Sequence, residues 1–272
     1  MAETAAIETQ PQVVRQEVAE GVCRLTLAQP HRRNALSETM MTALLSAIET
    51  AGADASVRVV VIAAEGPAFS AGHDLKELIQ HRAGPDGGRA YYDRIFTLCA
   101  RLMTAIVRLP KPVIAEVKGV ATAAGCQLAA SCDLVVAAET ARFATPGVNI
   151  GLFCSTPMVA LSRVVGAKQA MEMLLLGEPI DAATARSFGL VNRVVAETEL
   201  TGEVDRLAAQ IIAKSPLTLK IGKEAFYAQA EMGLDAAYAY TARVMTENML
   251  ARDAAEGIDA FLTKRSPHWQ GC

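Results

Sequence analysis

The sequence predicts an α/β fold that ends in a helical region. Strand and helix patterns alternate through the first two thirds of the chain, with spacings suited to right-handed crossovers between parallel strands. Within this part, residues 59–62 form the β-branched run Val-Val-Val-Ile, which is typical of a strand buried on both faces of a parallel sheet. From about residue 200 onward, only helical patterns follow.

The first elements are a predicted hairpin and a capped helix. Residues 13–18 and 22–27 favour two strands joined by a tight turn. Ser37 then has the character of an N-cap for a helix that runs to about residue 51, because apolar residues recur at helical spacing after it.

The next elements alternate between strands and helices. In chain order they are expected as a strand at 57–64, a loop at 69–74, a short helix from 75, a mobile surface loop at 83–88, a helix at 90–107, a strand at 113–117, a helix from about 123 and a strand at 133–137.

The C-terminal part is predicted to be mostly helical. Thr156-Pro157 has the form of a cap followed by a first helical residue, and Asp181 is expected to cap a helix that ends at Gly189. Four more helices are expected at 200–212, 216–230, 234–251 and 254–261. We therefore predict a core over residues 1–199 and a helical region over residues 200–272.

Composition excludes several classes of function. Hydrophobic residues make up 51% of the 272 residues and charged residues 20%, which fits a globular protein with a sizeable core. A net charge of -3 without a polybasic run argues against nucleic-acid binding, and no apolar run is long enough to span a membrane.

The six cysteines and four histidines show no metal-binding spacing, so no metal site is expected. Cysteines within apolar segments are interpreted as buried thiols in a reducing compartment. The polar, acid-containing N-terminus resembles neither a signal peptide nor a transit peptide, and we expect a cytoplasmic protein.

Two glycine-bearing loops are candidates for a functional site. FSAGHD follows the strand at 57–64, and GVATAAGCQ follows the strand at 113–117, each leading into a helix. Two N–H groups from such helix starts form an oxyanion hole when they are aimed at one point. The same glycines are equally compatible with tight turns and close packing that serve no ligand.

Longer motifs around these loops resemble a known family. FSAGHDLKEL, followed about 40 residues later by PVIAEVKGVATAAGCQLAASCDLVVAAETARFATPGVNIGL, is similar to the crotonase (enoyl-CoA hydratase/isomerase) superfamily. QPHRRNALS, GEPIDAATARSFGLVNRVV and GIDAFLTKRSP support the resemblance, which covers about residues 15–268. It implies a crotonase (ClpP-like) spiral of ββα units with an α-helical C-terminal trimerisation region, assembled as a homotrimer or a dimer of trimers.

The resemblance also implies a coenzyme A thioester as substrate, no permanently bound cofactor and a set of site residues. The thioester oxygen would lie between the backbone N–H groups of His73 and Ala124, which with Gln127 are the predicted catalytic residues. The predicted substrate-binding residues are Arg32, Ala71, Asp74, Leu75, Lys76, Gly125, Gly147, Cys154, Ser155 and Lys264. For Arg32 and Lys264 a solvated charge is the rival interpretation, and for Asp74, Cys154 and Ser155 a structural role is.

Gln127 and Gly147 stand where hydratases of this family carry two glutamates. Neither can transfer a proton, and a positioned acid or base is worth about 10²–10⁴ in rate. The methylmalonyl-CoA decarboxylase of the family also carries a histidine at the position of His73. Decarboxylation needs no base, only an oxyanion hole for the enolate and a pocket that disfavours the carboxylate. We therefore expect an acyl-CoA enzyme of fatty acyl metabolism that stabilises a thioester enolate; a decarboxylase-like enzyme and a non-catalytic acyl-CoA-binding protein remain the alternatives.

Overall fold

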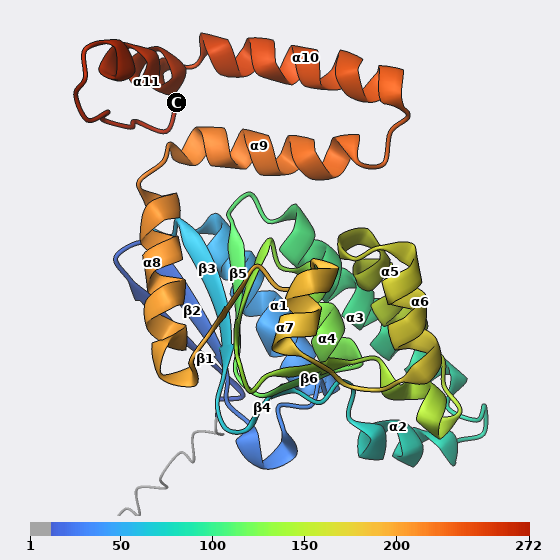
Figure 1. The fold of residues 1–272 in the computed structure, drawn as a ribbon. Helices are drawn as coiled ribbons and strands as arrows, with labels where there is room; N and C mark the ends of the chain where they lie inside the picture. The colour runs from blue at the N-terminus through green and yellow to red at the C-terminus, as the bar shows by residue number, and fades with distance from the viewer. Residues whose placement is uncertain (1–11) are drawn as a thin grey trace, which may run out of the picture.

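The computed structural model describes residues 12–272, whose strands form two sheets (Figure 1). Six strands have the order β1-β2-β3-β5-β7-β10 and four have the order β4-β6-β8-β9. The first sheet contains β1 (Val14–Ala19), β2 (Val22–Leu27), β3 (Val59–Ala64), β5 (Val113–Val117), β7 (Leu134–Ala138) and β10 (Arg193–Val195). The second contains β4 (Ala68–Ser70), β6 (Val120–Thr122), β8 (Arg142–Ala144) and β9 (Ile180–Asp181).

Helices cover both faces of the larger sheet. In chain order, the helices of the described residues are α1 (Glu38–Ala53), α2 (Leu75–Arg82), α3 (Arg89–Arg108), α4 (Ala124–Ser131), α5 (Ser155–Val164), α6 (Ala167–Leu176), α7 (Ala182–Phe188), α8 (Leu200–Ile212), α9 (Pro216–Gln229), α10 (Leu234–Leu250) and α11 (Arg252–Leu262). Short 3-10 turns occur at η1 (Pro30–Arg32), η2 (Pro146–Ile150) and η3 (Glu197–Glu199).

Strand β3 lies in the middle of the larger sheet, as its β-branched sequence predicts. It pairs in parallel with β2 and β5. Val60 and Ile62 join the main core beneath α1 and α3, whereas Val59 and Val61 face the smaller core beneath α8. Because successive strand residues point to opposite faces, the uninterrupted apolar run serves both cores.

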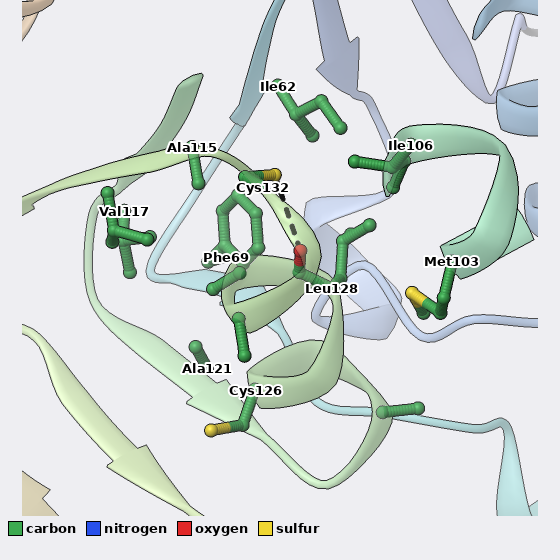
Figure 2. Close-up of a cluster of buried hydrophobic side chains, with 14 of the residues drawn as sticks. Ile62, Phe69, Met103, Ile106, Ala115, Val117, Ala121, Cys126, Leu128 and Cys132 are labelled. Carbon is green, nitrogen blue, oxygen red and sulfur yellow. Dashed lines mark hydrogen bonds between the residues drawn. The ribbon is translucent and has the colours of Figure 1, made fainter. Parts of the chain in front are cut away.

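The chain alternates between the two sheets as it advances. β3 is followed by β4, β5 by β6 and β7 by β8, and each partner strand adds beside the previous one in its own sheet. The result is a spiral of repeated turns whose interior is filled by α4 and apolar side chains. Figure 2 shows Phe69 of β4 in the main core, whose buried residues include Ala115 and Val117 of β5 and Leu128 of α4.

Predicted and observed boundaries agree closely for most long elements. The hairpin turn has left-handed backbone angles at Glu20 and Gly21, and Ser37 accepts a hydrogen bond from the Met40 N–H as the cap of α1. Asp181 caps α7, which ends at Gly189. The four helices expected after residue 200 are α8 to α11.

Helix α4 begins at Ala124, with Ala123 as its cap, close to the expected start at about residue 123. Two other boundary predictions need correction. The loop expected at 69–74 contains the end of β4. Helix α5 begins at Ser155, so Thr156 and Pro157 lie inside its first turn. The first turn tolerates proline because its N–H groups have no intrahelical acceptor.

The last three helices extend away from the two sheets (Figure 1). Helix α8 still packs on the larger sheet, whereas α9 and α10 form an antiparallel pair beyond it. A buried polar contact fastens α9 to the core: Lys223 Nζ and Tyr227 Oη both donate to the carboxylate of Asp133, at 2.6 and 2.9 Å. The predicted boundary between residues 199 and 200 stays a prediction.

All six cysteines are free thiols, and only Cys272 is exposed. Burial raises the pKa of Cys99 and of Cys126 to about 12, so both thiols are held in the protonated, unreactive form. Among residues 12–272, no helix is long and apolar enough to cross a membrane, and no group of three or more His, Cys, Asp or Glu side chains is placed to hold a metal ion.

Candidate active site

The two candidate loops meet at one edge of the second sheet. β4, β6 and β8 are parallel neighbours, so their carboxyl ends lie side by side. Gly72 follows β4, and its φ of +84° is one that a side chain rarely allows. A Cβ on Gly72 would lie 2.8 Å from Ala123 Cβ and 3.1 Å from Ala124 N, so the two loops are in van der Waals contact.

A second close approach fixes the start of α4. Gly125 lies directly on Ser70, the last residue of β4, and a Cβ there would be 2.2 Å from the Ser70 carbonyl oxygen. Ala123 has φ 50° and ψ -119°, an unusual conformation for alanine, and its N–H donates to the Ala144 carbonyl at 2.9 Å. The helix start is therefore held between β4 and β8.

The loop that follows β2 is hydrogen-bonded to the FSAGHD loop. The Leu36 N–H donates to the Gly72 carbonyl at 2.8 Å, and the Ala71 N–H donates to the Arg33 carbonyl at 3.0 Å. The buried Asn34 side chain donates to the carbonyls of Glu65 and Ala68, which fixes the approach to β4. Backbone and amide hydrogen bonds of this kind hold the FSAGHD loop rigid.

Two backbone N–H groups are left open at this edge. Within residues 12–272, neither the His73 N–H nor the Ala124 N–H donates to an acceptor in the protein. Ala124 is the first residue of α4, so the positive end of the helix dipole adds to its N–H. The two donors lie on the loops that Gly72 and Ala123 bring into contact.

The His73 ring lies against α3. Its Nδ1 is 3.4 Å from the Leu36 carbonyl oxygen, and its ring meets Phe96 edge-on with centroids 5.4 Å apart. Burial lowers the pKa of His73, against a smaller raising effect of the Leu36 carbonyl. Because a carbonyl only accepts, Nδ1 must carry the ring proton, which leaves Nε2 with a lone pair.

Gln127 is a buried residue of α4 that is only 4% exposed. Its Oε1 lies 3.7 Å from the Cys99 thiol of α3. Phe96 and Cys99 are three residues apart, so the His73 ring and the Gln127 amide contact neighbouring turns of α3. The two predicted catalytic side chains are thus brought to the same helix face.

Gly147 is the second residue that the resemblance to the family aligns with a glutamate, and it has no side chain. Gly147 is buried in η2, where a Cβ would lie 2.4 Å from the Leu152 carbonyl oxygen and 2.9 Å from Cys154 Sγ. This space is filled by the loop 151–154, so no longer side chain fits at residue 147 without moving it. Cys154 is buried, while Ser155 is exposed at the start of α5.

The predicted coenzyme A path begins at α2. Asp74 caps this helix by accepting from the Lys76 and Glu77 N–H groups, and it also pairs with Arg32. Ala71 is half-buried, whereas Leu75 and Lys76 are exposed on the helix surface. Arg32, Asp74 and the start of α2 therefore lie together, and their contact with coenzyme A stays a prediction.

Within one chain, Lys264 does not lie near Arg32, Asp74 and α2. It follows α11, on the far side of the molecule from α2 (Figure 1). The surface hollow lined by Arg58, Lys111, Lys220 and Trp269 also lies near that end, and none of the residues predicted for the site contributes to it.

Thr145 is a residue that the sequence interpretation missed. It follows β8 directly, is fully buried and has an Oγ1 without a hydrogen-bond partner in the protein. A single threonine in FATPG carries no pattern that separates it from a turn residue. Its position next to the edge described above became visible only once β8 was placed.

Comparisons with known proteins show the family to which the chain belongs. The profile of the enoyl-CoA hydratase/isomerase family matches residues 17–272. The chain belongs to the enoyl-CoA hydratase/isomerase family. It is 49% identical to the mitochondrial enoyl-CoA hydratase domain-containing protein 3 of Xenopus laevis, over 94% of this chain and 85% of that protein.

Two solved structures of the enoyl-CoA hydratase/isomerase family resemble the chain closely. An enoyl-CoA hydratase of Mycobacterium smegmatis is 52% identical, with a TM-score of 0.90 over 94% of this chain and 98% of that one. Human enoyl-CoA hydratase domain-containing protein 3 is 46% identical, with a TM-score of 0.89 over 94% of this chain and all of that one. The predicted crotonase fold with its helical C-terminal region is confirmed.

The prediction of a cytoplasmic protein is wrong by this comparison. Five curated vertebrate relatives of the enoyl-CoA hydratase/isomerase family, 44–49% identical to the chain, carry the word mitochondrial in their names. The prediction rested on a polar N-terminus, most of which lies outside the described residues. That prediction depends on the lack of a recognised signal or transit peptide and not on any feature specific to cytoplasmic proteins.

Proposed function

We propose that the protein binds coenzyme A thioesters and that the N–H groups of His73 and Ala124 stabilise the thioester enolate. The observation that carries this proposal is the pair of open N–H donors on two loops in contact. When a thioester becomes an enolate, its oxygen gains negative charge. Donors already fixed in place then lower the barrier without reorganisation.

The same geometry supports a substrate path over α2. The proposed coenzyme A contacts are Arg32, Ala71, Asp74, Leu75 and Lys76, of which Asp74 acts by ordering Arg32 and the start of the helix. Gly125, Gly147, Cys154 and Ser155 would border the acyl group. Lys264 would reach coenzyme A only from a neighbouring subunit, because it lies far from α2 of its own chain.

The proposed site lacks an evident side chain to transfer the protons that a hydratase reaction requires. Gln127 cannot exchange a proton and Gly147 has no side chain, so neither replaces a carboxylate. Asp74 is capping α2 and pairing with Arg32, and the Glu77 carboxylate accepts from the Glu38 N–H. Enolate formation by loss of carbon dioxide needs no base, which favours decarboxylation as the second candidate reaction.

The oxyanion hole can be tested by removing one N–H. Proline at residue 124 is unsuitable, because a residue before proline avoids the ψ of -119° that Ala123 adopts. Replacement of Ala124 by lactic acid turns the amide into an ester and removes only the N–H. We expect kcat for any thioester substrate to fall about 10²–10³-fold.

The matched control is the same replacement at Ala182, which is the first residue of helix α7 and follows β9. It should leave kcat unchanged. Full turnover in the residue 124 ester, with the protein folded, would exclude the proposed oxyanion hole.

Assays with two kinds of thioester substrate distinguish the possible reactions. Loss of enoyl absorbance from crotonyl-CoA, abolished in Gln127→Ala, would establish hydration with Gln127 placing the water. Release of carbon dioxide from malonyl-type thioesters without crotonyl-CoA turnover would establish decarboxylation. Binding of both thioesters without turnover of either would leave a binding protein.

A further inference from the structure

The surface hollow beside Trp269 lies at the opposite end of the larger sheet from the candidate active site. Arg58 comes directly before β3 and Lys111 comes two residues before β5, so the hollow borders the amino ends of these strands. The two loops of the candidate site follow the carboxyl ends of β3 and β5. The hollow has a volume of about 580 Å³, which lies within the roughly 300–1,000 Å³ typical of small-molecule sites.

Segments from before and after α8 line this hollow. The end of α1, the chain that leads into β3 and residues 110–112 come from the part that forms the larger sheet. The first turn of α9 and the tail residues 269–271 come from the C-terminal part. A ligand that binds there contacts both parts and stabilises their folded arrangement by mass action.

The lining of the hollow is positively charged. Arg58, Lys111 and Lys220 line it, and none of the described residues around it is acidic. Within residues 12–272, none of these three cations forms an ion pair. Arg58 and Lys111 are half-buried, so two of the charges are partly removed from water without a carboxylate partner.

Two carboxylates act on these cations from outside the hollow. Asp54 interacts with Lys111, and Asp253 interacts with Arg58. Each carboxylate already accepts hydrogen bonds of its own, Asp54 from Ser56 and Asp253 from N–H groups of the tail. They reduce the positive potential but occupy none of the hollow, which stays open to an anion from solution.

Hydrogen bonds to backbone carbonyls hold two of the cations in place. Arg58 Nη2 donates to the Lys214 carbonyl at 2.7 Å, and Lys111 Nζ donates to the Ala51 carbonyl at 2.7 Å. In the described chain, Arg58 Nε and Nη1 make no hydrogen bond, and the Leu217 N–H at the start of α9 has no acceptor. Because these donors are already ordered, an anion can bind them with little further loss of conformational freedom.

Trp269 adds a flat apolar surface to the hollow. Its indole N–H donates to the Ala213 carbonyl at 2.8 Å, and a Cβ on Gly257 would lie 3.0 Å from the ring, so the ring is fixed against α11. Planar bases pack favourably on such a ring, and phosphate oxygens accept hydrogen bonds from guanidinium and ammonium groups. A nucleoside phosphate carries both of these parts.

We infer that the surface hollow binds a nucleoside phosphate, with the phosphates at Arg58, Lys111, Lys220 and the Leu217 N–H and the base against Trp269. This site is separate from the proposed thioester site and does not depend on it. Its ligand joins the tail and α9 to the amino ends of β3 and β5.

The test uses the emission of Trp269, which is the single tryptophan of the chain. Titration of the full chain with ADP should change this emission until the site is saturated. Adenosine and inorganic phosphate, measured separately by calorimetry, should each bind at least about tenfold more weakly than ADP, because each offers only one of the two parts.

Lys220→Glu should weaken ADP binding about tenfold or more, because repulsion replaces a charge-assisted contact with phosphate. Lys220 is exposed and makes no ion pair, so the variant should keep its fold. Lys168→Glu makes the same change of charge on an exposed residue of α6 and is the matched control. It should bind ADP as the unmodified protein does.

Crotonyl-CoA distinguishes two sources of the nucleotide. An emission change with ADP alone would identify free nucleotides as the ligands. An emission change with both, weakened in Lys220→Glu, would extend the ligand to the nucleotide part of coenzyme A. Unchanged emission with ADP, an ADP affinity that Lys220→Glu leaves intact, or equal affinity for inorganic phosphate would overturn the inference, and each leaves the proposed thioester site unaffected.

Discussion

His73 links three parts of the site through three different groups. Its N–H has no acceptor among residues 12–272, its Nδ1 contacts the Leu36 carbonyl, and its ring meets Phe96 edge-on. The resemblance to the family predicts a role for its backbone N–H, but only the structure gives the orientation of its ring. Side-chain contacts of this kind arise from loops distant in sequence, so no local pattern predicts them.

We expect the half-buried His73 ring to give the protein a pH dependence of stability. Its pKa is lowered in the folded protein from the ordinary 6.5, so the unfolded chain binds more protons below that pH. The contribution of His73 is therefore complete above about pH 6.5 and is lost as the pH falls toward the folded pKa. We expect the free energy of unfolding to fall more steeply from pH 7.5 to 5 in the unmodified protein than in His73→Phe.

Urea unfolding at pH 7.5, 6 and 5 measures both curves. The variant keeps the aromatic contact with Phe96 and loses only the titrating nitrogens. Parallel curves for the two proteins would show that the ring does not titrate differently on folding.

Among the elements, the long ones were predictable and the shortest were not. Continuous apolar runs predict β3 and β5, and helical periodicity between clear caps predicts α8 to α11. β4, β6 and β8 are three residues each, too short for a period to appear, and they form only because each pairs with a neighbour from another turn of the spiral. The strands that present the site were thus the ones that sequence could not place.

The C-terminal segment is held by one buried carboxylate. Asp253 of α11 accepts from the Ser215 hydroxyl and from the N–H groups of Gln270 and Gly271, the last two at 2.7 and 3.0 Å. Trp269, the single tryptophan, donates from its indole to the Ala213 carbonyl at 2.8 Å. The segment is therefore folded back onto the start of α9.

We expect Asp253→Ala to release this segment before the core unfolds. The emission of Trp269 should shift to longer wavelength in the absence of denaturant, while far-ultraviolet circular dichroism stays the same. Asp259→Asn, which weakens only an exposed ion pair with Arg265, is the control and should leave the emission unchanged. Unshifted emission in Asp253→Ala would mean that Asp253 does not hold the segment.

At the scale of the whole molecule, the last helices expose more apolar surface than a monomer usually tolerates. Leu250, Phe261 and Leu262 are 77%, 83% and 72% exposed. Composition and periodicity could not tell whether this face packs on its own core or on another subunit, and within the described chain it packs on neither sheet (Figure 1). We expect self-association through α9 to α11, as a trimer or a dimer of trimers.

Sedimentation equilibrium should give three or six times the 28.8 kDa of one chain. The double substitution Phe261→Asp and Leu262→Asp should shift the protein to smaller species, because two charges would be buried at the interface. Thr263→Asp, next to them on the exposed surface, controls for added charge. A monomeric unmodified protein would refute the expectation.

The open donors between the two loops belong to the main chain. Any amino acid other than proline at residue 73 or 124 supplies the same N–H, and what holds the donors is the packing of Gly72 on Ala123 and of Gly125 on Ser70. In the proposed site, the groups that would hold the substrate oxygen are therefore set by backbone packing, whereas the groups that would move protons are side chains. Substitution of Gln127 would then change the proton chemistry of the proposed site and leave the two N–H donors in place.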